Sequence, residues 1–163
     1  VFLAANSTQN LGNVPKTRID GFELEAVVTP GADIPLNAGL GMTWSEIKEF
    51  PDPVVIGNEA PLISRSTFNL GFQWAPQLKD TLDGLLRVDY RRTGDTWWEV
   101  YNTTVRDPIQ LVDARVGVKG GNVGVYIFGS NIFDEEYNAE FSPGGFVFKA
   151  RPRVYGVEAS FEF

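Results

Sequence analysis

Five charged residues on two segments offer most of the chemistry in this sequence. Arg87, Asp89 and Arg91 alternate along one segment, and Asp113 and Arg115 along a later one. Residues two apart in an extended chain point to the same side, so each segment presents its charges on one face. Two interpretations fit: the five residues line an interior space and contact a bound molecule, or they form cross-strand ion pairs. We expect mainly the ion pairs.

A second candidate site is aromatic. The stretch "DTWWEVYN" contains Trp97, Trp98 and Tyr101 within five residues. Flat aromatic rings stack on ligands, and they also mark the water boundary of a membrane. Both interpretations stay open, and under the first one these three residues contact a ligand from a loop.

Residues for enzyme chemistry and metal binding are scarce. The sequence has no histidine and no cysteine, which removes the usual zinc ligands and the Ser–His and Cys–His pairs. The acidic stretch around Asn131 and Asp134 offers too few converging oxygens for calcium, and we expect these two residues to fix a turn through side-chain hydrogen bonds. We therefore expect no enzyme activity and no cofactor.

Composition narrows the class further. The chain has 163 residues, the size of one domain, and its 14 Lys+Arg against 21 Asp+Glu give a net charge of −7. That balance argues against a nucleic-acid partner, because phosphate binding needs a basic surface. No signal peptide is visible and the chain begins at Val1 rather than Met, which suggests a mature or excised piece.

Alternation of apolar and polar residues runs along nearly the whole chain and predicts an all-β protein. Seven segments show it: residues 22–28, 36–44, 68–74, 86–91, 112–118, 123–133 and 153–163. Residues 123–133 are apolar on both faces, so we expect both faces to be buried. Residues 1–10 have room for the end of an eighth strand.

The strands are long and their ends are aromatic. A sandwich strand runs about 5–6 residues, whereas a transmembrane strand needs about 9–11, with aromatic rings at the interfaces. Aromatic residues near the predicted strand ends are Trp44, Phe50, Trp74, Trp97, Trp98 and Tyr155. This pattern favours a membrane barrel, although a soluble β-sandwich with an apolar core remains an alternative.

The links between strands alternate strictly in length. Short links fall at residues 30–33, 76–81 and 119–122, and long links fall at about residues 51–63, 97–107 and 134–146. All short turns then lie at one end of the sheet and all long loops at the other. Outer-membrane barrels have this asymmetry.

The chain ends on "RVYGVEASFEF". Its apolar face holds Tyr155, Val157, Phe161 and Phe163, with Ala159 as a weak member of the series. An exposed apolar strand edge is a template for strand addition. An assembly factor can therefore capture such a strand before a barrel closes.

Four stretches together resemble the C-terminal end of the barrel of TonB-dependent outer-membrane receptors. They are "IDGFELEA" (residues 19–26), "GNEAPLISRSTFNLGFQW" (57–74), "FGSNIFDEEYN" (128–138) and "RPRVYGVEASFEF" (151–163). The element "NIFDEEY" resembles the family's NLFD-x-x-Y pattern. The resemblance covers almost the whole chain.

The resemblance implies fold and function. Family members are 22-stranded barrels of the Gram-negative outer membrane, with an N-terminal plug and a TonB box. They import siderophores, cobalamin or other scarce nutrients with energy from the inner membrane. The plug, the TonB box and about two thirds of the strands have no counterpart here. Residues 1–163 are thus expected to be the C-terminal part of such a barrel, seven or eight antiparallel strands of an up-and-down transmembrane sheet.

The same resemblance implies partners and roles. The partners are outer-membrane lipid, the barrel assembly machinery, a small-molecule nutrient or metal chelate such as an iron–siderophore complex, and the TonB complex through the missing N-terminal part. Tyr155, Val157, Phe161 and Phe163 match the assembly signal of terminal strands. The charged residues are then lumen or plug contacts: Arg87, Asp89, Arg91, Asp113 and Arg115. Two alternatives remain, a complete eight-stranded porin-like or structural barrel and a soluble β-sandwich binding module.

Two structural expectations separate these alternatives. In the fragment, neighbouring strands pair in chain order and the first and last strands stay far apart with open edges. The two faces of the sheet should also differ, one facing lipid and the other facing the inside of the barrel. Residues expected to face lipid are Leu36, Leu40, Phe72, Trp74, Val88, Val116, Val157 and Phe161. Residues expected on the inner side are Asn37, Gln73, Arg87, Asp89, Asp113, Arg115 and Glu158.

Overall fold

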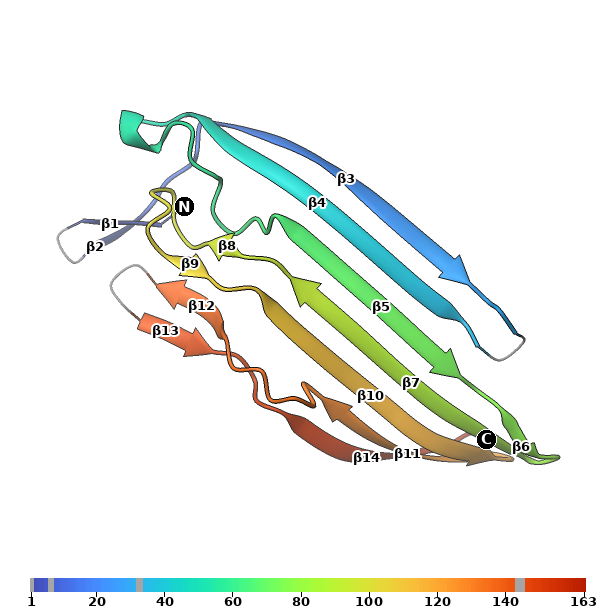
Figure 1. Ribbon diagram of the computed structural model, residues 1–163. Coiled ribbons are helices and arrows are strands. Elements are labelled where there is room, and N and C mark those ends of the chain that lie inside the picture. Colours follow the sequence, from blue (N-terminus) through green and yellow to red (C-terminus); the bar gives the residue numbers. More distant parts are fainter. Residues whose placement is uncertain (1, 6–7, 32–33, 143–145) are drawn as a thin grey trace.

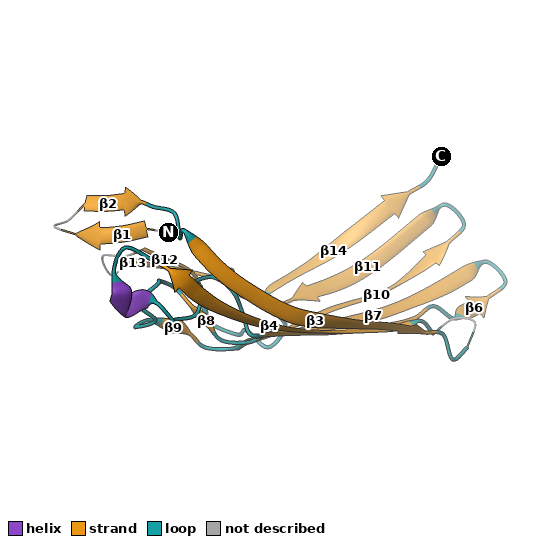
Figure 2. Ribbon diagram, turned by 90° about the horizontal axis from the view of Figure 1, so that it is seen from above, coloured by secondary structure: helices purple, strands orange, loops and turns teal. Residues whose placement is uncertain are grey.

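The computed structural model of this chain describes residues 2–5, 8–31, 34–142 and 146–163. One antiparallel sheet dominates (Figure 1), and Figure 2 shows that this sheet curves. Its long strands are β3 (Lys16–Val28), β4 (Leu36–Glu49), β5 (Ser66–Trp74), β7 (Leu82–Thr93), β10 (Ile109–Gly120), β11 (Val123–Ser130) and β14 (Val154–Phe161). The short β6 (Gln77–Lys79) pairs with β7 beside this series.

The strands form a meander. Their order across the sheet is β14-β11-β10-β7-β5-β4-β3, so each long strand pairs with its neighbours in the chain. The expected topology is confirmed, because β5 and β10 lie in one sheet and not in two stacked ones. Within the described residues no ladder joins β3 to β14. The sheet is therefore open, which speaks against both the sandwich and the small closed barrel.

The two ends of the sheet differ as expected (Figure 1). The short turns lie together at one end, and the long loops carry small elements at the other. These elements are η1 (Pro53–Val55), β8 (Thr96–Trp97), β9 (Val105–Arg106), β12 (Asn138–Ser142) and β13 (Phe146–Lys149). In the part of the chain that the structure describes, no helix is long and apolar enough to cross a membrane.

The N-terminal residues correct one expectation. The described residues 2–5 and 8–10 do not supply an eighth strand of the main sheet. Instead β1 (Phe2–Ala5) and β2 (Thr8–Leu11) pair with each other as a separate hairpin. Pairing of β1 with β2 closes a shorter loop than pairing of either strand with a distant edge of the sheet, and therefore costs less conformational entropy.

The register keeps two faces apart across the whole sheet. One row runs through Leu36, Phe72 and Val88, which lie directly opposite one another on β4, β5 and β7. This side is called the apolar face. The adjacent row runs through Asn37, Gly71 and Asp89 and belongs to the polar face. Every residue expected to face lipid lies on the apolar face, and every residue expected inside lies on the polar face. Which face contacts lipid stays a prediction.

Among the described residues, the apolar face has no protein cover. Val157 is 71% exposed and Phe22 is 52% exposed. Trp44 and Trp74 are also exposed near opposite ends of this face. Transmembrane barrels carry aromatic rings at these two levels, where the membrane meets water. Phe50 directly follows β4 and packs against a buried cluster in the loops, and its place in an aromatic boundary stays a prediction.

β11 departs from expectation. Both of its faces were expected to be buried, but Val123, Val125 and Ile127 are each about half-exposed. Tyr126 and Phe128 on its polar face are only partly buried. The prediction of double burial was wrong because a single sheet layer offers no second layer to cover either face.

Glycines let the large rings of β11 lie flat on the polar face. Gly117 lies opposite Tyr126, and Gly156 lies opposite Phe128. A Cβ at either glycine would overlap the facing aromatic ring. The close approach of ring and backbone therefore requires glycine at these two positions.

Candidate functional site: the polar face and its loops

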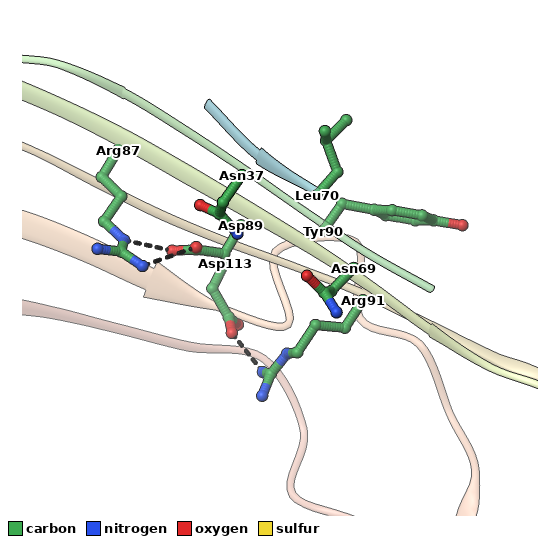
Figure 3. Close-up of a pocket in the computed structure, with 8 residues that line it drawn as sticks. All are labelled: Asn37, Asn69, Leu70, Arg87, Asp89, Tyr90, Arg91 and Asp113. Atoms are coloured by element: carbon green, nitrogen blue, oxygen red, sulfur yellow. Dashed lines mark hydrogen bonds and ion pairs between the residues drawn. The ribbon is translucent and has the colours of Figure 1, made fainter. Parts of the chain in front are cut away.

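The charged residues of the polar face line a shallow pocket of about 330 Å³ across β4, β5, β7 and β10. Figure 3 labels the lining residues and shows Leu70 and Tyr90 pointing away from the polar group. The polar members are Asn37, Asn69, Arg87, Asp89, Arg91 and Asp113. Four of the five predicted charged residues thus meet in one place.

Like charges lie opposite one another on the polar face. Asp89 faces Asp113, and Arg87 faces Arg115 in the register of β7 and β10. Like charges directly opposite are destabilising, and the side chains avoid this by pairing along or diagonally across strands (Figure 3). The Arg87 Nε lies 2.7 Å from Asp89 Oδ2, and the Arg91 Nη2 lies 2.5 Å from Asp113 Oδ2.

Arg115 lies on β10, two residues after Asp113, and completes the set by reaching across β11. Its Nη2 lies 2.8 Å from Glu158 Oε1 on β14, and its guanidinium stacks 4.2 Å from the ring centroid of Tyr126. All five predicted residues are therefore in ion pairs. Contact with a ligand or a plug stays a prediction.

Asp113 also anchors the loop that leaves β11. Its Oδ1 accepts hydrogen bonds from Ser130 Oγ at 2.8 Å and from the backbone N–H of Asn131 at 2.9 Å. Asn131 is buried and adopts a positive φ of 50°. Its side chain donates to and accepts from the backbone of Glu135, at 3.0 and 2.8 Å.

Asp134 secures the far side of the same loop. It has a φ of 58°, and its Oδ1 accepts from the backbone N–H of Arg153 at 2.9 Å. Asn and Asp tolerate this left-handed conformation better than other residues with side chains. The expectation that Asn131 and Asp134 fix the turn is confirmed.

The end of β4 and the first two long loops form one packed unit. Its buried members are Ile47, Val55, Ala60 and Val100, against which Val14, Phe50 and Ile63 pack. Among the described residues these four are the buried apolar side chains. Residues 47–65 and 95–104, called the loop unit below, therefore carry a small core that the sheet lacks.

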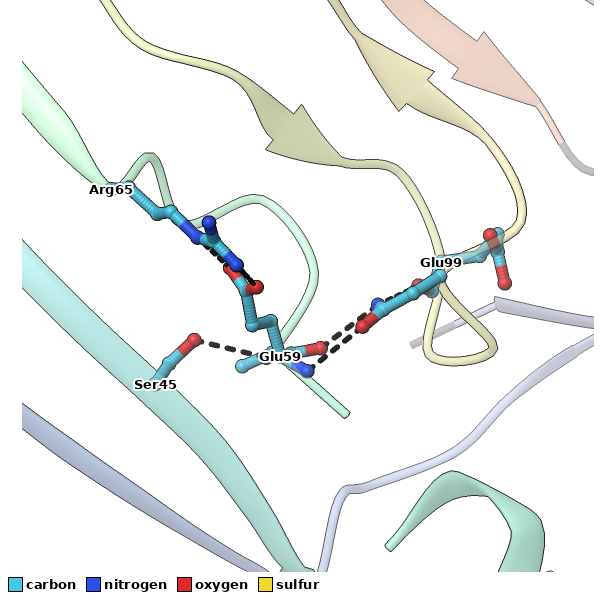
Figure 4. Close-up of polar contacts among 6 residues, drawn as sticks. Ser45, Glu59, Arg65 and Glu99 are labelled. Carbon is cyan, nitrogen blue, oxygen red and sulfur yellow. Dashed lines mark hydrogen bonds and ion pairs between the residues drawn. The ribbon is translucent and has the colours of Figure 1, made fainter. Parts of the chain in front are cut away.

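Side-chain hydrogen bonds join the two loops (Figure 4). Asn102 Oδ1 accepts from the backbone N–H of Glu59 at 2.8 Å, and Asn102 Nδ2 donates to the Glu59 carbonyl at 3.1 Å. Asn58 donates in the same way to the carbonyl of Val100 at 2.9 Å. Within the second loop, the carboxylate of Glu99 accepts hydrogen bonds from the backbone N–H groups of residues 101, 103 and 104.

Glu59 and Arg65 form the charged part of the loop unit (Figure 4). The Arg65 Nε donates to Glu59 Oε2 at 2.8 Å, and its Nη2 contacts the other carboxylate oxygen. The hydrogen bond from Arg65 lowers the pKa of Glu59 below its ordinary value. Both residues lie in the loops, beyond the strands of the sheet.

The predicted aromatic residues lie in this loop region and already have protein partners. Trp98 packs on Phe141 at 6.1 Å between ring centroids, with Arg106 at 5.7 Å over its ring. The Tyr101 hydroxyl donates to Asp52 at 3.3 Å, and the Trp97 carbonyl accepts from a backbone N–H of the first loop. Stacking on a ligand by these residues stays a prediction.

The terminal residues expected to form the assembly signal are accessible. Tyr155, Val157 and Phe161 lie on the exposed apolar face of β14, and the rings of Phe161 and Phe163 meet edge to face at 5.4 Å. β14 pairs only with β11 among the described strands, so its other edge is free. Recognition by an assembly factor stays a prediction.

Sequence reasoning missed Glu59, Glu99 and Asn102. For Glu59 the only signal is its place in a loop with three Pro, one Gly and one Asn, which indicates turns and names no partner. No cluster of three or more acidic groups with metal-binding geometry is present among the residues that the structure describes.

Comparison with known proteins gives one family. The family model described as TonB dependent receptor-like, beta-barrel, matches residues 2–132. The ferric yersiniabactin uptake receptor FyuA from Yersinia pestis superposes with a TM-score of 0.81 at 15% identity, over 90% of this chain and 24% of its own.

Other solved receptors share the fold. BauA, the ferric preacinetobactin receptor from Acinetobacter baumannii, has a TM-score of 0.77 at 19% identity and covers 99% of this chain. The ferric-catecholate import receptor Fiu from E. coli K12 has a TM-score of 0.73 at 20% identity and covers 98%. The chain spans only about a quarter of each structure, 24% and 23%.

Proposed function

This chain belongs to the TonB-dependent receptor β-barrel family, and from that premise we propose that it forms the C-terminal wall of a larger outer-membrane barrel that imports an iron–siderophore complex. In this proposal residues 1–163 belong to a longer chain whose other parts supply the plug and the remaining strands. The wall contributes lumen surface and external loops and performs no chemistry of its own.

The observation that carries the proposal is the open sheet with an uncovered apolar face. β3 and β14 each leave one row of backbone N–H and C=O groups without a strand partner among the described residues. Such edges are templates for further strands. Apolar side chains such as Val116 and Ile127 are exposed. Contact with lipid hydrocarbon lowers the free energy of such side chains relative to contact with water.

The substrate class is argued from similarity. FyuA, BauA and Fiu are receptors for ferric chelates, and the family consists of transport receptors. At 15–20% identity the likeness shows the fold alone. An iron chelate is therefore our proposal for the substrate of this chain, by analogy with these receptors. Its remaining proposed partners are the TonB complex, reached through the N-terminal part, and the barrel assembly machinery, reached through β14.

The test is uptake by the complete receptor. The gene containing this chain would be expressed in a Gram-negative strain that lacks its own ferric siderophore receptors, with and without a working TonB. We expect uptake of at least one radiolabelled ferric siderophore from a panel, and only when TonB works. Absence of TonB-dependent uptake for the whole panel, with the barrel assembled in the outer membrane, would refute the proposal.

A further inference from the structure

Three polar side chains lie where the apolar face ends, at the long-loop end of the sheet. Ser66 is the first residue of β5, Arg92 is the last residue of β7 on this face, and Gln110 is the first of β10 on it. Arg92 lies on the apolar face because it follows Val88 by four residues along an unbroken ladder. Gln110 is directly opposite Arg92, and Arg92 Nη1 donates to Ser66 Oγ at 3.4 Å.

We propose that Arg92, Ser66 and Gln110 bind the phosphate of a phosphorylated lipid in the outer leaflet of the membrane. Arg92 pairs with the phosphate oxygens, and the other two side chains donate hydrogen bonds to them. This inference rests on the proposed function, because it requires the apolar face to contact lipid. It does not depend on which solute the receptor imports.

Arg92 is a cation without a carboxylate partner. In the part of the chain that the structure describes, its side chain forms no ion pair and one hydrogen bond, to the neutral hydroxyl of Ser66. A guanidinium carries five N–H donors in a planar fork that matches the oxygens of a phosphate. Most of these donors therefore remain for a ligand.

Two other arginines at the same margin already have carboxylate partners. Arg18 Nε lies 2.6 Å from Asp20, which is directly opposite Trp44 at the end of the apolar face. Arg153, just before β14, lies 3.8 Å from Asp134. A lipid phosphate at these two arginines would compete with a carboxylate of the protein. At the arginine of β7 it would displace no ion pair.

The neighbours of Arg92 supply further donors. The Tyr90 hydroxyl donates to Gln110 Oε1 at 2.9 Å, which orients the amide and leaves its two N–H donors without a partner among the described residues. Ser66 Oγ accepts from Arg92, so its own O–H remains a donor. Donors from three neighbouring strands thus lie together, with no acidic side chain among them.

The surroundings fit a lipid headgroup better than a dissolved ion. Tyr90 lies two residues nearer to the short turns than Arg92, and its ring packs on Phe68 at 5.9 Å between centroids. Tyr90 and the 44% exposed Leu70 both point away from the polar face (Figure 3). Apolar surface therefore begins directly beside the charge, as at the level where acyl chains join headgroups. A lipid gains both contacts, and a dissolved ion gains only the charged one.

The test is lipid binding by the complete receptor, purified in detergent and followed by native mass spectrometry. The probe is lipid A, a phosphorylated glycolipid of the outer leaflet. We expect the affinity for lipid A to be about tenfold lower in Arg92→Gln, because a charge-assisted contact is lost. Arg18→Gln is the matched control and should leave the affinity unchanged, since Asp20 already pairs with Arg18. Ser66→Ala and Gln110→Ala should each weaken binding about threefold.

A second lipid probe identifies the group that Arg92 contacts. Lipid A from which the phosphates have been removed should bind the wild type about as weakly as intact lipid A binds Arg92→Gln. Removal of the phosphates should have little further effect in that variant, since both changes remove the same contact. Arg92→Lys keeps the charge and should retain most of the affinity, which separates loss of the contact from loss of the fold. Inorganic phosphate at the concentration of the lipid should not displace it.

The outcomes are separable. Equal affinity of the wild type and Arg92→Gln for lipid A, or an equal loss in Arg18→Gln, would overturn the site. Displacement by inorganic phosphate would also overturn it and would assign Arg92 to dissolved anions. A loss confined to Arg92→Gln, in a receptor that takes up no ferric siderophore, would support the lipid site and refute the proposed substrate. Ferric siderophore uptake by a receptor whose lipid binding ignores Arg92 would overturn the site and leave the proposed function intact.

Discussion

The sheet and the loop unit of this protein are stabilised in different ways. In the sheet, backbone ladders up to 13 pairs long hold strands whose apolar side chains remain largely exposed. In the loop unit, Ile47, Val55 and Val100 are fully buried, and side chains hydrogen-bond to the backbone of the facing loop. The sheet therefore depends on surroundings that cover it, whereas the loop unit has its own core.

The largest expected effect tests the core of the loop unit. Ile47 is 0% exposed, and truncation of a buried isoleucine to alanine costs about 2–5 kcal/mol. We expect Ile47→Ala to speed amide hydrogen exchange throughout residues 50–65 and 98–104 of the complete receptor. Ile19→Ala is the control, since Ile19 is 56% exposed on β3. Similar exchange in both variants would show that the loops are not held by this core.

The next effect tests the apolar face. Leu40 and Val116 are 37% and 51% exposed with no protein cover, so Arg at either position should lower the free energy of unfolding in membranes by ~2–4 kcal/mol near the bilayer midplane. Gln73→Arg, on the polar face, should cost little. Unfolding of the complete receptor in lipid vesicles measures this. Equal tolerance at the three positions would mean that the two faces are assigned wrongly.

A smaller effect is expected where the sheet meets the third loop. Asp113→Asn weakens the pair with Arg91 and the bonds to Ser130 and Asn131, which should cost about 1–3 kcal/mol and raise proteolysis at residues 131–138. Asp89→Asn removes the same charge from a pair made within one exposed strand, and should cost under about 1 kcal/mol. If Asp89→Asn raises proteolysis at residues 131–138 as much as Asp113→Asn does, then Asp113 does not anchor the loop.

The smallest effect is a pH dependence of the loop unit. The Arg65 hydrogen bond lowers the pKa of Glu59 from its ordinary 4.5, so the ionised pair stabilises the folded loops fully above about pH 5 and is lost as pH falls through the lower folded value. The protection factors of the amides in residues 57–65, which correct for the pH dependence of intrinsic exchange, should therefore fall on acidification below pH ~4.5. In Glu59→Gln that step should be absent. Its persistence in the variant would assign the pH dependence to another group.

Much of the sheet was predictable from the sequence because its determinants are local. Side chains alternate with a period of two in any strand, so the apolar series from Leu36 to Trp44 specifies a face without knowledge of any partner. Alternating link lengths place loops and turns at opposite ends for the same reason. The turn after β11 was also predictable in part, since Asn131 acts on backbone groups four residues away, whereas the partner of Asp134 is the backbone of Arg153, 19 residues along the chain.

Tertiary structure decided the features that depend on distant partners. Glu59 and Asn102 lie 43 residues apart, and nothing local in either loop indicates the other. The burial of β11 and the partner of the N-terminal segment depended on what lies beside them in space. The alternation of Arg87, Asp89, Asp113 and Arg115 determined that these residues share a face. Only the register placed like charges opposite one another, and so decided that the ion pairs run along and diagonally across the strands.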